Sequence, residues 1–220
     1  MIPIIDEPDL PSLLAELGVV DLDDGTALED ANITGMRIDG APVEGLTLSG
    51  CRVSNVELTG ATLRNVNLTD VVVVESELSG STLDFASFQR VQFERCRMSG
   101  FVAPQLDAKH VTFAECRLDG CWLRMSTLDR CAFEDCDLSS ADFYTARITE
   151  SRFVRSQLSE AELSEAVLRE VSFHRSTIEG IKGGQVLRDI VIGSDQIIPF
   201  AFPVFAALGI VINDDYFDEG

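Results

Sequence analysis

Every fifth residue between Ile33 and Ile178 is a large apolar one, and this spacing constrains the fold more than any other feature of the sequence. Val, Ile, Leu, Met or Phe occupies 28 of these 30 positions, and the two exceptions are Ala103 and Ala108. Two residues before each of them, the side chain is Ala, Cys, Ser or Val in 26 of 30 cases. A period of five fits neither the roughly 3.6 residues of a helical turn nor the alternation of a strand. The chain must therefore turn a corner within every five-residue unit.

A longer period of twenty residues is superimposed on the period of five. If four units close one four-sided turn, the large and small residues both point inward, each about 4.8 Å from its equivalent twenty residues away. Aromatic rings stacked in this way attract each other by roughly 0.5–1.5 kcal/mol beyond their buried area. We therefore predict a four-sided β-solenoid over residues 31–180, with about 7.5 turns of twenty residues. Its central column would contain Ile33, Val53, Val73, Phe93, Phe113, Phe133, Phe153 and Phe173.

The five-residue unit resembles that of the pentapeptide-repeat family. The A(D/N)LXX pattern of that family is visible as Ala-Asp-Phe-Tyr-Thr at 141–145 and as Ala-Glu-Leu-Ser-Glu at 161–165. The resemblance covers 150 of the 220 residues and implies an all-β, right-handed quadrilateral β-solenoid, with the handedness taken from the family alone. At the spacing of β-strands, the turns would make a rod about 36 Å long.

All six cysteines occupy the small, inward position of a unit. A free cysteine is a small hydrophobe, whereas a zinc site needs thiolates that converge on one point. We therefore predict that the thiols pack in the core and that the protein holds no disulfide, metal or cofactor. The first basic residue is Arg37, so the basic start of a signal peptide is missing, which predicts a cytoplasmic protein. The cysteines are Cys51, Cys96, Cys116, Cys121, Cys131 and Cys136.

Residues 1–30 lie outside the repeat and are strongly acidic. They hold nine of the 37 acidic residues and no Lys or Arg, which is nearly half of the net charge of −20. Pro11 near the start, apolar residues up to Leu17 and Gly18 just past the end are typical of a short helix. We therefore predict an acidic N-terminal cap whose helix, over residues 11–17, covers the open first turn of the solenoid.

The repeat is disturbed at residues 101–110. Phe101 and Leu106 take the small position there, while alanines take the large one. Either the core keeps its volume through this exchange, or the ten residues leave the coil as a loop and return in register at Val111. Pro104 favours a local bulge, because proline cannot donate a hydrogen bond to the ladder.

Residues 181–220 follow the repeat, and we predict that they form a C-terminal cap and a dimerisation segment. We predict a last strand at 185–192, a helix at 195–208 that is bent by Pro203, and a final strand at 209–212. The apolar run is too short and too interrupted by proline to span a membrane. A bare apolar end would aggregate, so this run either caps the solenoid or forms an interface.

The tail also resembles the C-terminal segment of bacterial fluoroquinolone-resistance proteins of the Qnr type, which are pentapeptide-repeat proteins. In those proteins the equivalent segment makes a tail-to-tail dimer. The resemblance therefore implies a homodimer with a two-fold symmetric contact. The residues we expect in this contact are Phe200, Phe202, Val204, Phe205 and Leu208.

No group of residues predicts catalysis. His110 and His174 are separated by about three turns, roughly 15 Å along the axis, so they cannot share a site. The register places no histidine beside a serine, and the sequence has no glycine-rich phosphate loop. We therefore predict a protein that is not an enzyme and acts by binding another protein.

The Qnr-type resemblance implies DNA mimicry, in which an acidic rod fills the DNA site of DNA gyrase or another type II topoisomerase without binding nucleic acid. Duplex DNA carries one charge per ~1.7 Å, so a rod of this length would need about 20 negative charges. The repeat holds 22 acids and 15 bases, a net charge of −7. Mimicry then requires that one face concentrates the acids, or that dimerisation and the acidic ends together produce the negative electrostatic field. Glu160, Glu162 and Glu165 are the acids we expect to contact such a partner.

The alternative function is a protein-interaction scaffold without DNA mimicry. On one side of the square, residues 1 to 5 of each twenty, large side chains point outward in successive turns. Such patches mark contacts with other proteins. Either a partner binds here, or the N-terminal segment or residues 101–110 fold over the patch. Its residues are Phe85, Val102, Trp122, Met125 and Tyr144.

Overall fold

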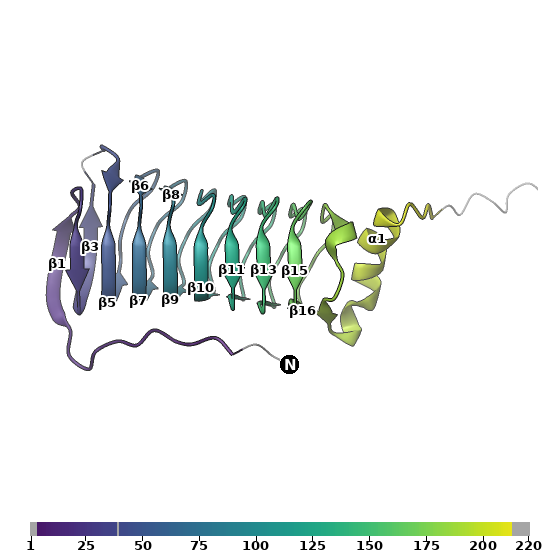
Figure 1. Cartoon of the computed structure of the whole chain (residues 1–220), viewed down its shortest axis with the longest axis horizontal. Coiled ribbons are helices and arrows are strands. Elements are labelled where there is room, and N and C mark those ends of the chain that lie inside the picture. Colours follow the sequence, from purple (N-terminus) through teal and green to yellow (C-terminus); the bar gives the residue numbers. More distant parts are fainter. Residues whose placement is uncertain (1–3, 39, 213–220) are drawn as a thin grey trace, which may run out of the picture.

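The protein is a rod of coiled chain in the computed structural model, which describes residues 4–38 and 40–212 (Figure 1). Strands of successive coils pair in parallel, in line along the rod. Ladder partners within the repeat are twenty residues apart: Asn67 pairs with Ser87, and Ser87 pairs with Asp107. The predicted β-solenoid and its register are therefore confirmed.

Within the described residues, the coil is built from short strands in two sheets and is followed by one α-helix. The larger sheet has 14 strands and the smaller has three. The larger sheet contains β1 (Ala15–Asp21), β2 (Ala27–Glu29), β3 (Ala31–Arg37), β5 (Thr47–Ser54), β7 (Asn67–Val74), β9 (Ser87–Glu94), β10 (Asp107–Ala114), β11 (Thr127–Asp129), β12 (Ala132–Glu134), β13 (Arg147–Thr149), β14 (Arg152–Val154), β15 (Val167–Arg169), β16 (Ser172–His174) and β17 (Val191–Ile192). The smaller contains β4 (Val43–Glu44), β6 (Thr62–Arg64) and β8 (Thr82–Asp84). The 3-10 helices η1 (Gly184–Val186) and η2 (Ser194–Gln196) precede helix α1 (Ile197–Ala207).

The predicted aromatic column forms the centre of the core. From Phe93 to Phe173, five rings stack with centroids 4.9 to 5.0 Å apart and planes within 5° of parallel. Phe143 meets two of these rings edge-on. Phe200 of α1 closes the column, because its ring centroid lies 5.8 Å from that of Phe173. The helix therefore covers the C-terminal end of the core.

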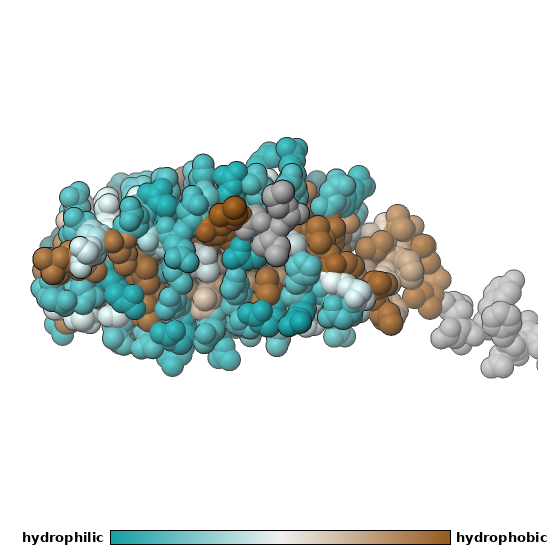
Figure 2. Space-filling model, turned by 90° about the horizontal axis from the view of Figure 1, so that it is seen from below, coloured by the Kyte–Doolittle hydropathy of each residue, from teal (hydrophilic) through white to brown (hydrophobic). Residues whose placement is uncertain are grey.

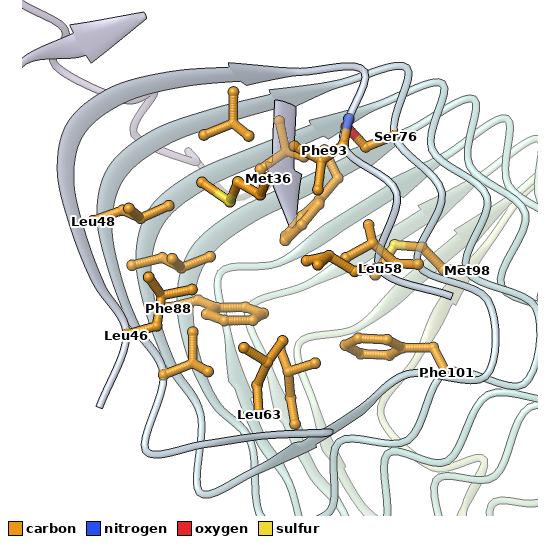
Figure 3. Close-up of a pocket in the computed structure, with 17 residues that line it drawn as sticks. Met36, Leu46, Leu48, Leu58, Leu63, Ser76, Phe88, Phe93, Met98 and Phe101 are labelled. Carbon is orange, nitrogen blue, oxygen red and sulfur yellow. The ribbon is translucent and has the colours of Figure 1, made fainter. Parts of the chain in front are cut away.

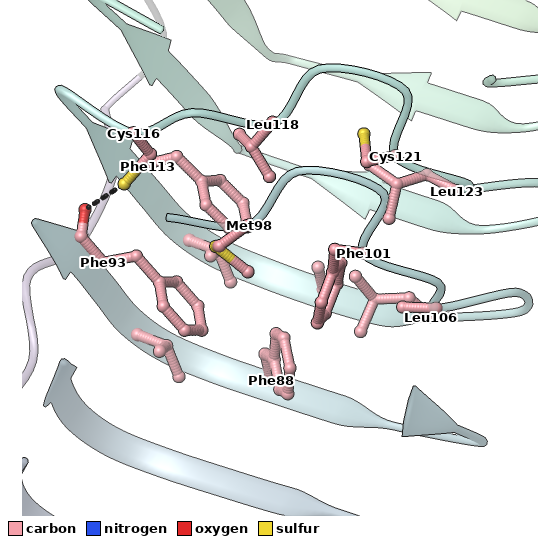
Figure 4. Close-up of a cluster of buried hydrophobic side chains, with 14 of the residues drawn as sticks. Phe88, Phe93, Met98, Phe101, Leu106, Phe113, Cys116, Leu118, Cys121 and Leu123 are labelled. Carbon is pink, nitrogen blue, oxygen red and sulfur yellow. Dashed lines mark hydrogen bonds between the residues drawn. The ribbon is translucent and has the colours of Figure 1, made fainter. Parts of the chain in front are cut away.

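The six cysteines are free and buried in the same core, as predicted. Five of the thiols hydrogen-bond to backbone oxygens of neighbouring coils, namely those of Cys51, Cys96, Cys116, Cys131 and Cys136. The thiol of Cys116, for example, donates to the carbonyl oxygen of Phe93 at 3.5 Å (Figure 4). The cysteines therefore fill small inward positions without forming disulfides.

The disturbed segment, residues 101–110, remains in the coil. Phe101 is only 1% exposed and points into the core (Figure 4), so the exchange of large and small residues keeps the core volume. The bulge expected from Pro104 is wrong. Two coils later in the same column, the N–H of Tyr144 donates to the side chain of Asp142 at 3.0 Å and not to the ladder. Proline at this position therefore removes no ladder hydrogen bond.

The predicted N-terminal helix over residues 11–17 is also wrong. Residues 15–21 form β1, which pairs in parallel with β3 and places Ala15 opposite Ala31. A strand satisfies the open backbone groups of β3, whereas a helix laid across them would leave them unpaired. The coil consequently begins at Ala15, within the segment that we expected to lie outside it.

The C-terminal segment agrees with the prediction in its helix and differs in its strands. Helix α1 lies within the expected 195–208, contains Pro203 and is followed by Gly209 at a φ of 72°. Of the strand expected at 185–192, only β17 forms, because the first of these residues belong to the 3-10 helix η1. The strand expected at 209–212 is wrong, since these residues form no strand. Among the described residues, no helix has both the length and the apolar character needed to cross a membrane.

Candidate protein-binding site

The patch predicted from the sequence is exposed along one side of the rod. Phe85 is 62% exposed, Trp122 and Met125 are each 53% exposed, and Tyr144 is 41% exposed. Val102 is half-buried and bridges directly to Trp122 in the next coil. We call these five residues the Trp122 platform. The solenoid thus brings together side chains that lie up to 59 residues apart in the sequence.

Arg124 holds the aromatic part of the platform in place. Its guanidinium carbon lies 5.6 Å from the ring centroid of Trp122 and 5.7 Å from that of Tyr144. Two of its nitrogens lie 2.6 Å from one carboxylate oxygen of Asp142, a residue only 8% exposed. Hydrogen bonds to Asp142 therefore hold the guanidinium of Arg124 in place, and cation–π attraction holds the rings of Trp122 and Tyr144 against it. We call these three side chains the stack. Sequence reasoning missed Arg124 and Asp142, although the twenty-residue register places Arg124 in the column of Tyr144.

The three glutamates expected to contact a topoisomerase lie in one coil near the C-terminal end. Glu160 and Glu165 are exposed at corners, and Glu162 is half-buried. One carboxylate oxygen of Glu162 accepts a hydrogen bond from the N–H of Ser164 at 2.7 Å. Among the described residues, none of the three glutamates forms a side-chain ion pair. Their charge therefore remains available to a partner.

Many other acids pair with an arginine in a neighbouring coil. Arg90 binds both carboxylate oxygens of Asp70 at 2.6 Å, and Arg155 does the same to Asp135 at 2.7 and 2.6 Å. These arginines hold the pKa of the two carboxyl groups below its usual range. On the side formed by residues 11–15 of each twenty, five acids face five arginines between residues 31 and 175. This side does not concentrate negative charge.

Most of the predicted dimer residues lie on an exposed apolar surface at the end of the rod. Phe202 is 59% exposed, Phe205 is 38% exposed and Leu208 is 69% exposed, while Val204 is half-buried. Apolar side chains cover this end, over α1, in Figure 2. Phe200 is different, because it is only 4% exposed and packs on the aromatic column. We call the four outward residues the tail face.

An apolar cavity of about 50 Å³ lies in the core of the N-terminal half (Figure 3). It occurs where valines replace phenylalanines in the central column, next to Val53 and Val73. Ser76 also lines it, but its hydroxyl already donates to the carbonyl oxygen of Val74 at 2.9 Å and accepts from the N–H of Val56 at 3.1 Å. The cavity therefore offers no free polar group that would orient a ligand.

Chemistry-bearing side chains are dispersed over the described part of the chain. There, no three His, Cys, Asp or Glu side chains gather in a group that could hold a metal ion. His110 hydrogen-bonds to the backbone of Asp6, and His174 lies three coils further along in β16. The two histidines therefore do not share a site.

Comparisons with known proteins agree with this architecture. A family model described as a pentapeptide repeat region matches residues 86–163 and 126–182, and one described as pentapeptide repeats (8 copies) matches residues 40–73 and 63–100. No curated protein matches the chain.

Two solved structures with similar coils illustrate how distant the structural matches are. Trypsin-treated QnrB1, a plasmid-mediated fluoroquinolone resistance protein, is 15% identical, with a TM-score of 0.45 over 92% of this chain and 100% of its own. HetL, involved in heterocyst differentiation regulation in the cyanobacterium Nostoc sp. strain PCC 7120, is 19% identical, with a TM-score of 0.39 over 84% of this chain and 89% of its own. Likenesses this remote carry no argument about function.

Proposed function

Because the chain belongs to the pentapeptide-repeat family, we propose that it is a non-enzymatic protein that binds a partner protein through the Trp122 platform. The observation that carries this proposal is the fixed, exposed stack of Trp122, Arg124 and Tyr144. Trp, Tyr and Arg are enriched at the energetic centres of protein interfaces. Rings that are already held in place lose little side-chain entropy when a partner covers them.

The proposal is tested on the full chain with a photo-crosslinking residue at Met125 or, as a control, at Val167. Val167 is 42% exposed and belongs to a different five-residue unit. We expect the crosslinker at position 125 to capture a partner that binds the Trp122 platform, and the crosslinker at position 167 not to capture it. After purification, that partner should bind the Trp122→Ala variant at least ~10-fold more weakly, because an interface Trp typically contributes about 2 kcal/mol or more. Equal capture at both positions, or a change below about twofold, contradicts the proposal.

We propose DNA mimicry directed at DNA gyrase or another type II topoisomerase as the second candidate function. The net charge of −20 and the rod shape favour it (Figure 1). The coil-to-coil ion pairs count against an even match to duplex DNA along the whole rod. Mimicry would therefore depend on the acidic N-terminal segment and on the unpaired glutamates near the other end.

Supercoiling assays with purified gyrase separate the two candidates. DNA mimicry predicts an effect that weakens as salt rises and as the glutamates are neutralised, because both changes reduce the electrostatic attraction. A salt-insensitive effect that Trp122→Ala abolishes assigns gyrase binding to the platform instead. No effect on gyrase or on related topoisomerases removes the mimicry candidate. The test variant is Glu160→Gln with Glu162→Gln and Glu165→Gln, and the charge-matched control is Glu57→Gln with Glu115→Gln and Glu179→Gln.

We also propose that two copies associate through the tail face. The four apolar residues of the tail face lie outside the hydrophobic core of the solenoid. The neighbouring Ile197 and Ile198 are 62% and 72% exposed. A contiguous apolar surface of this kind is usually covered in solution, and a two-fold contact covers it with the same surface of a second copy. Phe200 plays no part in the proposed contact, because it already packs within its own chain.

A further inference from the structure

Residues 4–11 lie along the outside of the rod and do not belong to the coil. This segment, which we call the arm, runs back from β1 beneath the strands of the following coils (Figure 1). The backbone N–H of Asp9 donates to a carboxylate oxygen of Asp70 at 2.9 Å. The backbone N–H of Asp6 donates to Nδ1 of His110 at 3.0 Å. The arm therefore contacts residues that lie 61 and 104 positions away in the sequence.

The arm follows one corner of the rod. Gly50, Asp70, Arg90 and His110 occupy this corner in four successive coils, and we call them the corner strip. The ring of Pro11 rests against Gly50, where an added Cβ would lie 3.3 Å from the proline Cδ. The hydrogen bond to Asp70, together with the charges of two arm residues, Asp6 and Asp9, raises the pKa of Arg90. The corner strip thus presents a cation and two hydrogen-bond acceptors to the arm.

The spacing of the arm matches the spacing of the coils. Asp6 and Asp9 are three residues apart, and they contact coils that are two apart. A polyproline II segment rises about 3.1 Å per residue, so three residues span about 9.3 Å. Two strand spacings amount to about 9.6 Å. Since a polyproline II helix has three residues per turn, both N–H groups also point the same way, and Pro8 and Pro11 favour such a conformation.

The arm is held far more loosely than the coil. Asp6, Glu7 and Asp9 are exposed and Ile4 is 80% exposed, while Ile5, Pro8 and Leu10 are half-buried, so no residue of the arm is fully buried. The backbone hydrogen bonds of Asp6 and Asp9 go to side chains and not to a strand. Segments with few buried apolar contacts and exposed hydrogen bonds open at low free-energy cost. The arm can therefore leave the corner strip while the solenoid stays folded.

We propose that the corner strip is a binding site for an extended, acidic, proline-containing peptide, that the arm occupies this site in cis, and that a segment of this kind from a partner protein displaces it. The arm holds three acids and no base, which complements Arg90, so its own sequence defines the chemistry of the ligand. The acceptor atoms of Asp70 and His110 favour a peptide ligand that presents two backbone N–H groups three residues apart, as Asp6 and Asp9 do in the arm. This site lies on a different side of the rod from the Trp122 platform and does not depend on it.

The test titrates the full chain with a fluorescent synthetic peptide that has the sequence of residues 4–14. We expect saturable binding that Arg90→Gln weakens about tenfold, because the positive charge that attracts the acids of the bound segment is lost. The matched control is Arg95→Gln, which breaks a similar pair with Glu75 at the next corner of the same coil and should change binding less than about twofold. A peptide with one glycine inserted between Glu7 and Pro8 should also bind about tenfold more weakly, because the three-residue spacing is lost.

A second variant, Asp6→Pro with Asp9→Pro, removes both N–H groups through which the arm binds and leaves every residue of the corner strip unchanged. We expect this variant to bind the peptide at least about tenfold more tightly than the native chain, because the arm no longer competes for the site. Unchanged or weaker binding, or no binding to any variant, overturns the proposal. Conversion of a native dimer into a monomer by this variant also overturns it, because the occupant would then be the arm of a second copy.

Discussion

At the corners of the rod, single residues adopt a backbone conformation that most side chains disfavour. Twenty-three residues other than glycine have a positive φ in the described chain, and all but Asp189 fall on the fifth position of a unit. The left-handed conformation costs an ordinary residue roughly 1–2 kcal/mol. The sequence shows glycine at many corners, but it does not show that Phe85, Thr145 and several arginines take the same conformation. Burial of the core offsets this strain.

Thr145 is the corner residue whose replacement should stabilise the protein. It is β-branched and has a φ of 57°, whereas Asn55 and Asn65 occupy equivalent corners at 53°. We expect Thr145→Asn to raise the free energy of unfolding by about 0.5–1 kcal/mol, since asparagine tolerates this conformation. Urea denaturation measures the change, and Thr127→Asn in strand β11 is the control, expected to give no gain. A loss of stability in Thr145→Asn would contradict the strain argument.

The buried cysteines should be inert in the folded protein. Burial raises the pKa of the Cys131 thiol to about 12 from its ordinary value of 9.0. Since only thiolates react with a disulfide reagent, we expect no reaction at pH 8 until denaturant unfolds the chain, after which all six thiols react. Because the pKa of the Cys131 thiol is higher in the folded protein than in the unfolded chain, its contribution to folding stability is complete below pH 9. This contribution is lost as the pH rises toward about 12. Fast reaction of native protein would contradict this account.

At the scale of structural elements, the aromatic column supports the core of the C-terminal half of the rod. Phe133 is fully buried and stacks on a ring at 5.0 Å on one side and at 4.9 Å on the other. We expect Phe133→Ala to lower the free energy of unfolding by ~3–5 kcal/mol, because the cavity cannot collapse between coils held by ladders. Denaturant titration tests this, with the exposed Phe85→Ala expected to cost under about 0.5 kcal/mol. A loss below about 1 kcal/mol would refute the role of the column.

The cavity in the N-terminal half predicts a stabilising substitution. Val73 lines the cavity and is the position next to Phe93 in the central column. We expect Val73→Phe to extend the stack by one ring and to raise the free energy of unfolding by about 0.5–2 kcal/mol. Thermal unfolding compares it with Val71→Phe, which enlarges a fully buried residue outside the cavity lining and should destabilise the protein through overpacking. Similar losses in the two variants would show that the ring does not enter the cavity.

At the scale of the whole molecule, the two ends of the rod are chemically different. The N-terminal end is acidic, and the C-terminal end carries the apolar tail face. We expect the full chain to be a dimer at micromolar concentration and Phe202→Glu with Leu208→Glu to make it a monomer, because charge at a buried two-fold contact meets its own copy. Light scattering measures the mass. Val19→Glu at the opposite end is the control, and a wild-type monomer would leave the tail face without a partner.

The period of five, the twenty-residue register and the inward thiols could all be predicted from the sequence. The same pattern recurs in successive coils, so the position assigned to a residue in one coil is supported by the equivalent residues in the others. The side chains of the Trp122 platform were found in the same way, because register alone places outward residues in columns. Arg124 was missed, since an arginine at a solvent-facing position is ordinary until its stacking geometry is known.

The sequence by itself determined the solenoid, because a five-residue pattern that keeps its register from residue 31 to residue 180 buries its large residues only if the chain turns a corner in every unit. Only the tertiary structure decided how the two ends of the solenoid are covered and which side chains on its surface contact one another. Strand β1 forms because the first coil leaves backbone groups that need hydrogen bonds, a requirement that outweighs the local helical signal of residues 11–17. The arm on its corner, Phe200 on the aromatic column and the arginine pairs depend on contacts between distant residues, which no local pattern records.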